Sequence, residues 1–200
     1  MENVDIVDCN MNVNRTASKI GGIAGINKND ITGKECPTSI DNLFECEIKN
    51  TSFFGNGDIG GAAGVNYEGC SISNIIFEGD ASVYNITMWY VDDYENSAGR
   101  SIGGIVGYNQ LNAVVDKVVV RNIKFLLEGD ALINHDPRVG YVIGENKGHL
   151  NEYIMKNVSN KQEGDFALDS SGWFGRKDHK KHKKYLFAYE DGAIGFNNLG

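Results

Sequence analysis

One pattern of seven residues constrains the fold of this 200-residue chain more than any other feature. It consists of two glycines, two apolar residues, a third glycine, a variable residue and an asparagine. The strongest copies lie at residues 21–27, 60–66 and 103–109, and weaker copies lie at 140–146 and 192–197. Five copies in so short a chain predict a repeat architecture, in which each unit packs on its neighbours.

The spacing and content of the copies predict what each one does. Successive late glycines are 39, 43, 37 and 51 residues apart, which falls within the range of solenoid repeats. The two residues before the late glycine are apolar in every copy, which predicts a short strand buried on both faces. We expect the glycine where φ is positive or another backbone comes close, and the asparagine in the turn that follows. Stacked asparagines can then share side-chain hydrogen bonds as a ladder. These structural repeat positions are Gly25, Asn27, Gly64, Asn66, Gly107, Asn109, Gly144, Asn146, Gly195 and Asn197.

Two further elements recur between the glycine-rich copies. One places an asparagine directly before an apolar run, and the other is the tripeptide Glu-Gly-Asp. The first occurs at Asn42, Asn74, Asn122 and Asn157, and the second at residues 78–80, 128–130 and 163–165. One unit therefore comprises a glycine-rich strand, an asparagine turn, a second strand and a Gly-Asp turn. Apart from residues 150–155, no stretch shows helical periodicity, so the sequence predicts a mainly β fold.

The two strand motifs resemble the GLUG repeat family, whose pattern is a Gly-Gly-apolar-apolar-Gly-x-Asn strand followed by an apolar-x-Asn strand. The resemblance covers roughly residues 18–160, with a last copy near 192–198, and Tyr141 departs from the pattern where a glycine is expected. It implies a single-stranded, parallel, right-handed β-helix, or β-solenoid, at the surface of a bacterium. Family members often sit in large cell-surface proteins, including regions upstream of immunoglobulin A1-specific metallopeptidases, and the repeat itself contributes no catalytic residues.

The resemblance and the composition divide the chain into three parts. Residues 1–160 are expected to form solenoid repeats with an incomplete first unit, and residues 161–190 an insertion with an exposed basic loop at 176–184. Residues 191–200 are expected to start a further repeat. Both ends fall within strand sequence without a polar cap, so we expect a fragment of a longer chain whose ends self-associate.

Charge and cysteine content narrow the classes of partner. The chain has 27 acidic against 19 basic residues, a net charge of −8, which disfavours nucleic-acid binding. It contains neither an apolar run long enough for membrane insertion nor a signal peptide, so the expected extracellular or cell-surface location rests on the resemblance.

Its four cysteines form no C-x-x-C pair, which leaves zinc and redox motifs unsupported. We expect small buried hydrophobes at these positions, Cys9 and Cys46 among them.

The best candidate for ligand contact is Trp89-Tyr90 followed by Asp92-Asp93. Aromatic rings stack on the faces of sugars, and carboxylates accept hydrogen bonds from sugar hydroxyls. These residues are therefore a candidate contact for a carbohydrate. The alternative is a solvated loop, because adjacent aspartates in a strand point to opposite faces. The basic stretch at 176–184 likewise has two interpretations: it binds an anionic ligand, or it is a solvated insertion loop. No catalytic motif occurs, so we expect no enzyme, metal or cofactor site in these residues.

Three functions are compatible with these features. The first is a non-catalytic segment of a large bacterial cell-surface protein, which acts as a structural stalk or as an adhesive surface for a host protein or glycan. The second is the non-catalytic flank of a secreted immunoglobulin A1-type metallopeptidase. The third is a phage tail or receptor-binding β-helix.

Overall fold

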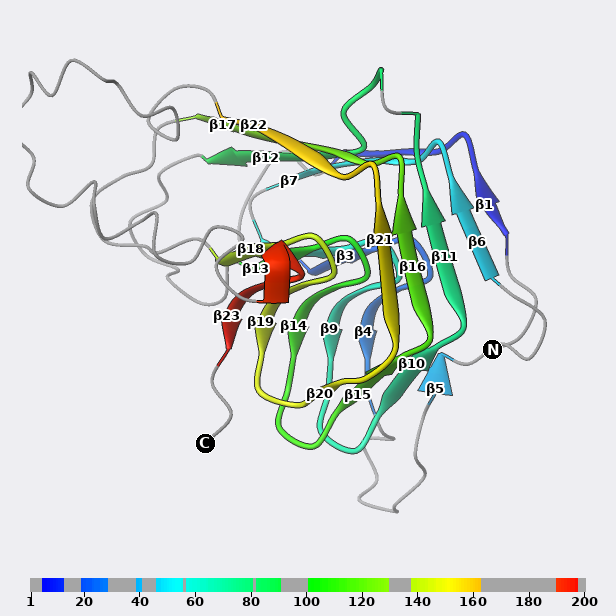
Figure 1. Cartoon of the computed structure of the whole chain (residues 1–200), viewed down its shortest axis with the longest axis vertical. Helices are drawn as coiled ribbons and strands as arrows, with labels where there is room; N and C mark the ends of the chain where they lie inside the picture. Colours follow the sequence, from blue (N-terminus) through cyan, green and yellow to red (C-terminus); the bar gives the residue numbers. More distant parts are fainter. Residues whose placement is uncertain are drawn as a thin grey trace, which may run out of the picture.

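The computed structural model describes residues 5–12, 19–28, 39–40, 46–55, 57–80, 82–90, 101–129, 138–162 and 190–197. Within these residues the elements are β-strands, apart from the single-turn 3-10 helix η3 (Glu190–Gly192). Each pairing of described strands is parallel, and the strands form five sheets (Figure 1). This confirms the prediction of a mainly β chain with parallel strands.

We name the sheets A to E in the order in which the chain first visits them. Sheet A contains β1 (Ile6–Val7), β6 (Cys46–Lys49), β11 (Ile75–Glu78), β16 (Val118–Arg121) and β21 (Tyr153–Lys156). Sheet B contains β2 (Asn10–Asn12), β7 (Ser52–Gly55), β12 (Ile86–Tyr90), β17 (Lys124–Gly129) and β22 (Ser159–Gln162). Sheet C contains β3 (Lys19–Gly21), β8 (Asp58–Gly60), β13 (Ser101–Gly103) and β18 (Arg138–Gly140).

Sheets D and E complete the set. Sheet D contains β4 (Ala24–Asn27), β9 (Ala63–Asn66), β14 (Val106–Asn109), β19 (Ile143–Asn146) and β23 (Ile194–Asn197). Sheet E contains β5 (Ser39–Ile40), β10 (Ser71–Ser73), β15 (Val114–Asp116) and β20 (His149–Leu150). The chain runs through one strand of each sheet before it returns to sheet A, and we call these five strands a circuit. Every strand therefore pairs with the strand of its sheet in the next circuit, as the parallel rows in Figure 1 show.

The register between circuits places like residues on like residues. In sheet A, Phe77 pairs with both Ile48 and Val120, and all three are fully buried. Sheets B and C repeat this arrangement with the rows Phe53–Ile86–Phe125 and Ile59–Ile102–Val139. Because complete burial of such a side chain contributes about 1.5–3 kcal/mol, these rows form the stabilising core between circuits.

The glycine-rich pattern forms the corner from sheet C to sheet D. The two apolar residues of each central copy are fully buried: Ala62 and Ala63, Ile105 and Val106, and Val142 and Ile143. This confirms the predicted burial on both faces. The preceding glycines make the corner tight, because a Cβ on Gly61 would lie 2.2 Å from the carbonyl oxygen of Gly104 in the next circuit.

The late glycine has one of the two expected roles. Among the described glycines only Gly69 and Gly192 have positive φ, so the prediction of positive φ at Gly64 and its counterparts is wrong. The glycine is required by close approach instead. A Cβ on Gly64 would lie 2.7 Å from the carbonyl oxygen of Asp58 in sheet C, and one on Gly107 would lie 2.5 Å from that of Ser101. Sheets C and D therefore pack backbone against backbone at these positions.

The asparagines at the ends of the sheet D strands form the predicted ladder. Nδ2 of Asn27 donates to Oδ1 of Asn66 at 2.8 Å, Asn66 to Asn109 at 2.9 Å, and Asn109 to Asn146 at 2.9 Å. Asn146 continues the column to Asn197 at 3.4 Å. The same amides also bind the carbonyl oxygens at the start of sheet E, since Asn66 donates to Val114 O at 3.2 Å. The ladder thus joins circuits and closes the corner from D to E.

The ladder asparagines end their strands instead of lying in the turn, and none of them has positive φ. Positive φ occurs at the corner from A to B and between E and A, and also at Gly69 and Asn112 in two turns from D to E. The residues at the first corner are Asp8, Asn50, Asn122 and Asn157, and those at the second are Asn74 and Lys117. Asn74 therefore lies at a different corner from Asn122 and Asn157, and the alignment of these three in one repeat element is wrong.

Three smaller expectations are also corrected. The Glu-Gly-Asp tripeptides are not equivalent, because Glu78 ends β11 whereas Glu128 and Gly129 lie inside β17. Residues 150–155 contain the end of β20 and the start of β21 rather than a helix. Cys9 is exposed and is no core residue, whereas Cys70 is buried; both are free thiols.

The glycine contacts yield a first prediction. Gly64→Val and Gly107→Val should each lower the free energy of unfolding by more than about 1 kcal/mol, because overpacking against backbone cannot relax through side-chain movement. Urea denaturation measures the change. Ser159→Val, at an exposed position in β22, is the matched control and should change stability little. Unchanged urea midpoints in both glycine variants would contradict the close packing of sheets C and D.

Candidate functional site

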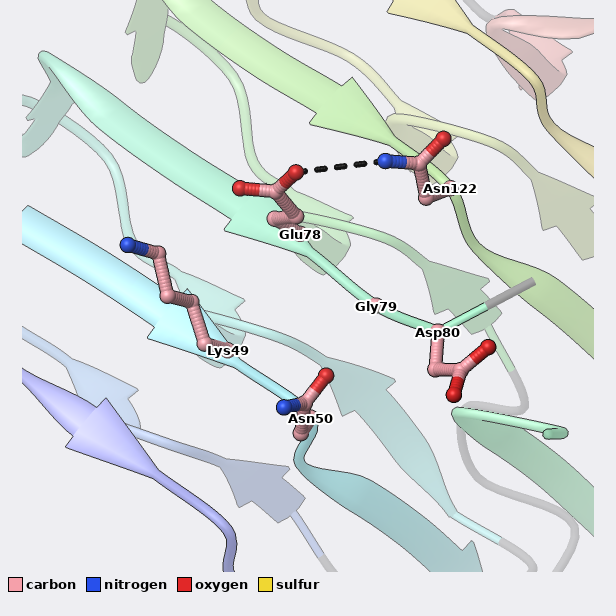
Figure 2. A pocket seen from close by; sticks show the side chains of 6 residues that line it. All are labelled: Lys49, Asn50, Glu78, Gly79, Asp80 and Asn122. Atoms are coloured by element: carbon pink, nitrogen blue, oxygen red, sulfur yellow. Dashed lines mark hydrogen bonds between the residues drawn. The ribbon is translucent and has the colours of Figure 1, made fainter. Parts of the chain in front are cut away.

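A polar depression lies at the corner where sheet A turns into sheet B. It has a volume of about 450 Å³ and is lined by Lys49, Asn50, Glu78, Gly79, Asp80 and Asn122. Figure 2 shows that the lining comes from three successive circuits, at the ends of β6, β11 and β16. Residues 28 to 73 positions apart in the sequence thus meet on one surface because the circuits stack.

One circuit lacks a side chain at the corner beside this depression. Asn50 and Asn122 occupy the left-handed corner position in the second and fourth circuits, and Asn157 donates to Oδ1 of Asn122 at 3.0 Å. In the third circuit Gly79 takes this place, so the outer column of corner side chains is interrupted. A Cβ on Gly79 would lie 2.1 Å from Oδ1 of the buried Asn85, which excludes larger residues. The column of corner side chains is therefore interrupted at Gly79, beside the depression.

Two carboxylates face this depression, and both have hydrogen-bond donors. Glu78 accepts from Arg121 at 2.8 Å and from Asn122 at 3.2 Å. The hydrogen bond from Arg121 is the main cause that lowers the pKa of Glu78 below its usual value. Asp80 accepts from the backbone N–H of Ser82 at 2.8 Å, and this bond likewise lowers the pKa of Asp80. Both groups are therefore anionic at neutral pH, and Lys49 of β6 lies in register with Glu78.

The arrangement provides hydrogen-bonding groups rather than reactive ones. Glu78 and Asp80 accept hydrogen bonds, and Lys49 and the amides of Asn50 and Asn122 donate them. In the described part of the chain no group of three or more His, Cys, Asp or Glu residues is placed to hold a metal. The depression can thus contact the hydroxyl, amide or charged groups of a partner.

A second polar cluster is buried between sheets C and D. Asp58, Ser101 and Arg138 begin successive strands of sheet C, and the backbone N–H of Ser101 donates to Asp58 at 3.1 Å. Glu145 of β19 is ion-paired with Arg138 and lies 3.4 Å from Nζ of Lys147. Burial raises the pKa of Asp58 to about 6, against smaller opposing contributions from Ser101 and Lys19.

This cluster has residue types found in hydrolases but not the accessibility of a hydrolytic site. Ser101 is 0% exposed, and Asp58 and Glu145 are each 4% exposed. The hydroxyl of Ser101 lies 3.5 Å from Glu145, which is at the limit of a hydrogen bond. The hydroxyl of Ser101 is shielded from solvent, and the cluster links strands of sheets C and D.

The structure places the predicted residues in three different ways. The ten repeat positions are brought together in sheet D, as described above. The backbones of Trp89 and Tyr90 lie in β12, in register with Glu128 and Gly129 of β17. Asp92, Asp93 and the basic stretch 176–184 lie outside the described residues. The predicted carbohydrate contact at Trp89–Asp93 therefore stays a prediction.

Sequence reasoning missed both the depression and the buried cluster. The signal for the cluster was present, because aligning the glycine-rich copies puts Lys19, Asp58, Ser101 and Arg138 at the same position, two residues before the first glycine. The signal for the depression was weaker. It required recognising that Gly79 stands where Asn50 and Asn122 stand in the neighbouring circuits.

Comparison with known proteins does not assign this chain to a family. No family model matches the chain, and no curated protein or solved structure matches it. Within the described residues, none of the helices has the length and apolar character needed to cross a bilayer.

The raised pKa of Asp58 yields a second prediction. Its folded pKa of about 6 exceeds the ordinary 3.8, so the folded state binds more protons in this window and Asp58 destabilises the fold as pH rises through it. Asp58→Asn should therefore gain stability relative to the parent chain between pH 4 and pH 7, on the order of 2–3 kcal/mol. Urea denaturation at a series of pH values measures the difference.

Asp80→Asn is the control with the opposite sign. The pKa of Asp80 is lowered in the folded state, so its stabilising effect is present at neutral pH and lost on acidification. The variant should lose stability relative to the parent as pH rises. A pH-independent difference for Asp58→Asn would contradict the burial of a titrating carboxyl between sheets C and D.

Proposed function

We propose that the chain is a β-solenoid of GLUG-like repeats and that it serves as a non-catalytic segment of a large bacterial cell-surface protein. In this proposal the stacked circuits form a structural stalk, and the polar depression is part of an adhesive surface for a host protein or glycan. The observation that carries the proposal is the five-sheet arrangement, in which each strand pairs with the strand one circuit later.

The stalk role is supported by the way in which each circuit contacts its neighbours. Backbone ladders, apolar rows and the asparagine column all join one circuit to the next. A structure of this kind grows in length without a change in cross-section, because each added circuit repeats the same contacts. Each added circuit would lengthen the stalk by about 4.8 Å, the spacing between neighbouring strands of a sheet.

The adhesive role is supported by the depression and its neighbourhood. Its lining offers acceptors in Glu78 and Asp80 and donors in Lys49 and Asn50, which suit the hydroxyl groups of a glycan or the polar groups of a protein surface. The depression is open rather than enclosed, and its lining residues come from the ends of neighbouring strands (Figure 2), which suits a repeated weak contact. Many copies on one cell surface would raise the overall affinity through multivalency.

A binding and turnover experiment tests this function. The purified chain should bind a member of a panel of immobilised host glycans and extracellular proteins in a saturable manner. Asp80→Asn combined with Glu78→Gln should weaken the binding several-fold, because both acceptors in the depression lose their charge. Asp116→Asn, on sheet E away from the depression, is the matched control and should bind as the parent does.

The same preparation tests the non-catalytic part of the proposal. Incubation with protein and glycan substrates should release no product, with or without added divalent metal. Cleavage that is abolished by a point substitution in this chain would overturn the proposal. Binding that is equal in the depression variant and its control would remove the depression from the adhesive surface.

A further inference from the structure

We infer that the two ends of the stacked circuits bind each other, so that copies of this chain associate head to tail in register. The inference rests on the solenoid of the proposed function and adds its partner, a second copy of the chain. Among the described strands, β1, β2 and β4 are the first of their sheets, and β21, β22 and β23 are the last. The backbone groups on their outer sides can extend the same parallel ladders into another copy.

The asparagine column gives this association a direction. In each step Nδ2 of one asparagine donates to Oδ1 of the asparagine one circuit later. At the first circuit, no described residue donates to Oδ1 of Asn27, and at the fifth, no described residue accepts from Nδ2 of Asn197. A donor at one end thus complements an acceptor at the other, so Asn197 of one copy can continue the column to Asn27 of the next.

The charges at the two ends of the stack are also complementary when copies associate head to tail. In sheet A the first circuit carries Asp5 and Asp8, whereas the fifth carries Lys156. Beside sheet C the signs are reversed, because the first circuit carries the exposed Lys19 in β3 and the fifth carries Glu190 and Asp191 in η3, which leads into the corner from C to D. Head-to-tail stacking brings opposite charges together at both places, whereas contact between two identical ends brings like charges together.

The helix η3 defines which edges take part. Its last residue, Gly192, continues the corner from C to D, because the N–H of Tyr141 donates to Gly192 O as that of Gly104 donates to Tyr141 O, whereas sheet C itself ends at β18. Sheet E ends one circuit earlier, at β20. The contact therefore uses sheets A, B and D, and η3 lies opposite β3 of the next copy. Such a heterologous contact does not close on itself, so it builds open filaments.

Cysteine cross-linking tests the register directly. In sheet A, Val7 and Lys156 lie in the row that also contains Lys49, Glu78 and Arg121. Stacked copies place Val7 and Lys156 directly opposite each other, about 4.8 Å apart, within the Cα range that a disulfide spans. The experiment uses the full chain with its four native cysteines replaced by serine.

Chains carrying Val7→Cys and Lys156→Cys are mixed at high concentration and oxidised. We expect a disulfide-linked heterodimer from the mixture and none from either chain alone. Leu111→Cys, at an exposed position in the middle of the chain, replaces Val7→Cys in the control mixture and should give none. Cross-linking of Val7→Cys to itself would show contact between like ends and would overturn the inference, as would a mixture that stays monomeric.

A cross-link within one chain separates failure of the inference from failure of the fold. Ser71 and Val114 pair between adjacent circuits, so Ser71→Cys with Val114→Cys should form an intrachain disulfide. If this intrachain disulfide forms and the heterodimer does not, the inferred association with a second copy is wrong, whereas the proposed function is not contradicted. If neither forms, the stacked circuits and the proposed function both fail.

Charge reversal supplies an independent measurement by sedimentation. Lys156→Glu should raise the concentration needed for association several-fold, since it opposes Asp5 and Asp8 of the next copy. Lys117→Glu, an exposed position between β15 and β16, is the matched control and should leave association unchanged. Equal effects of the two substitutions would contradict the placement of Lys156 at the contact.

Discussion

The column of buried amides at the ends of the sheet D strands is the interaction on which the structure depends most. Asn66 and Asn109 are 0% exposed, and each donates to the next asparagine while it accepts from the one before. A buried amide left without partners costs about 1–3 kcal/mol. A slip of one residue in any circuit would leave such groups unpaired and would turn apolar side chains outward, so the column fixes the register of the neighbouring sheets.

The glycines provide the second constraint, because they set the distance between sheets C and D. With no Cβ at Gly64 or Gly107, two strands of the same circuit pack backbone on backbone, and the chain reverses direction within a few residues. The circuits also differ at their corners, since Gly79 stands beside the depression where neighbouring circuits have an asparagine, and η3 gives one end its acidic residues.

The features of this fold that recur in every circuit can be predicted from the sequence. Features that depend on which residues of different circuits become neighbours cannot. The asparagine ladder is predictable because the same residue recurs after the same strand. The role of Gly64 is only half predictable, since glycine serves positive φ and close approach equally well. Lys117 carries no signal for its left-handed turn. Asp58 and Glu145 lie far apart in the sequence and meet only because the circuits stack, so their cluster required the structure.

Removal of one amide from the column tests the central role of the ladder most directly. Asn109→Ala leaves a donor on Asn66 and an acceptor on Asn146 unpaired in the core, so the free energy of unfolding should fall by more than about 2 kcal/mol. Asn151→Ala, at an exposed position between β20 and β21, is the matched control and should change it by less than about 0.5 kcal/mol. Equal and small losses in the two variants, measured by urea denaturation, would contradict the account.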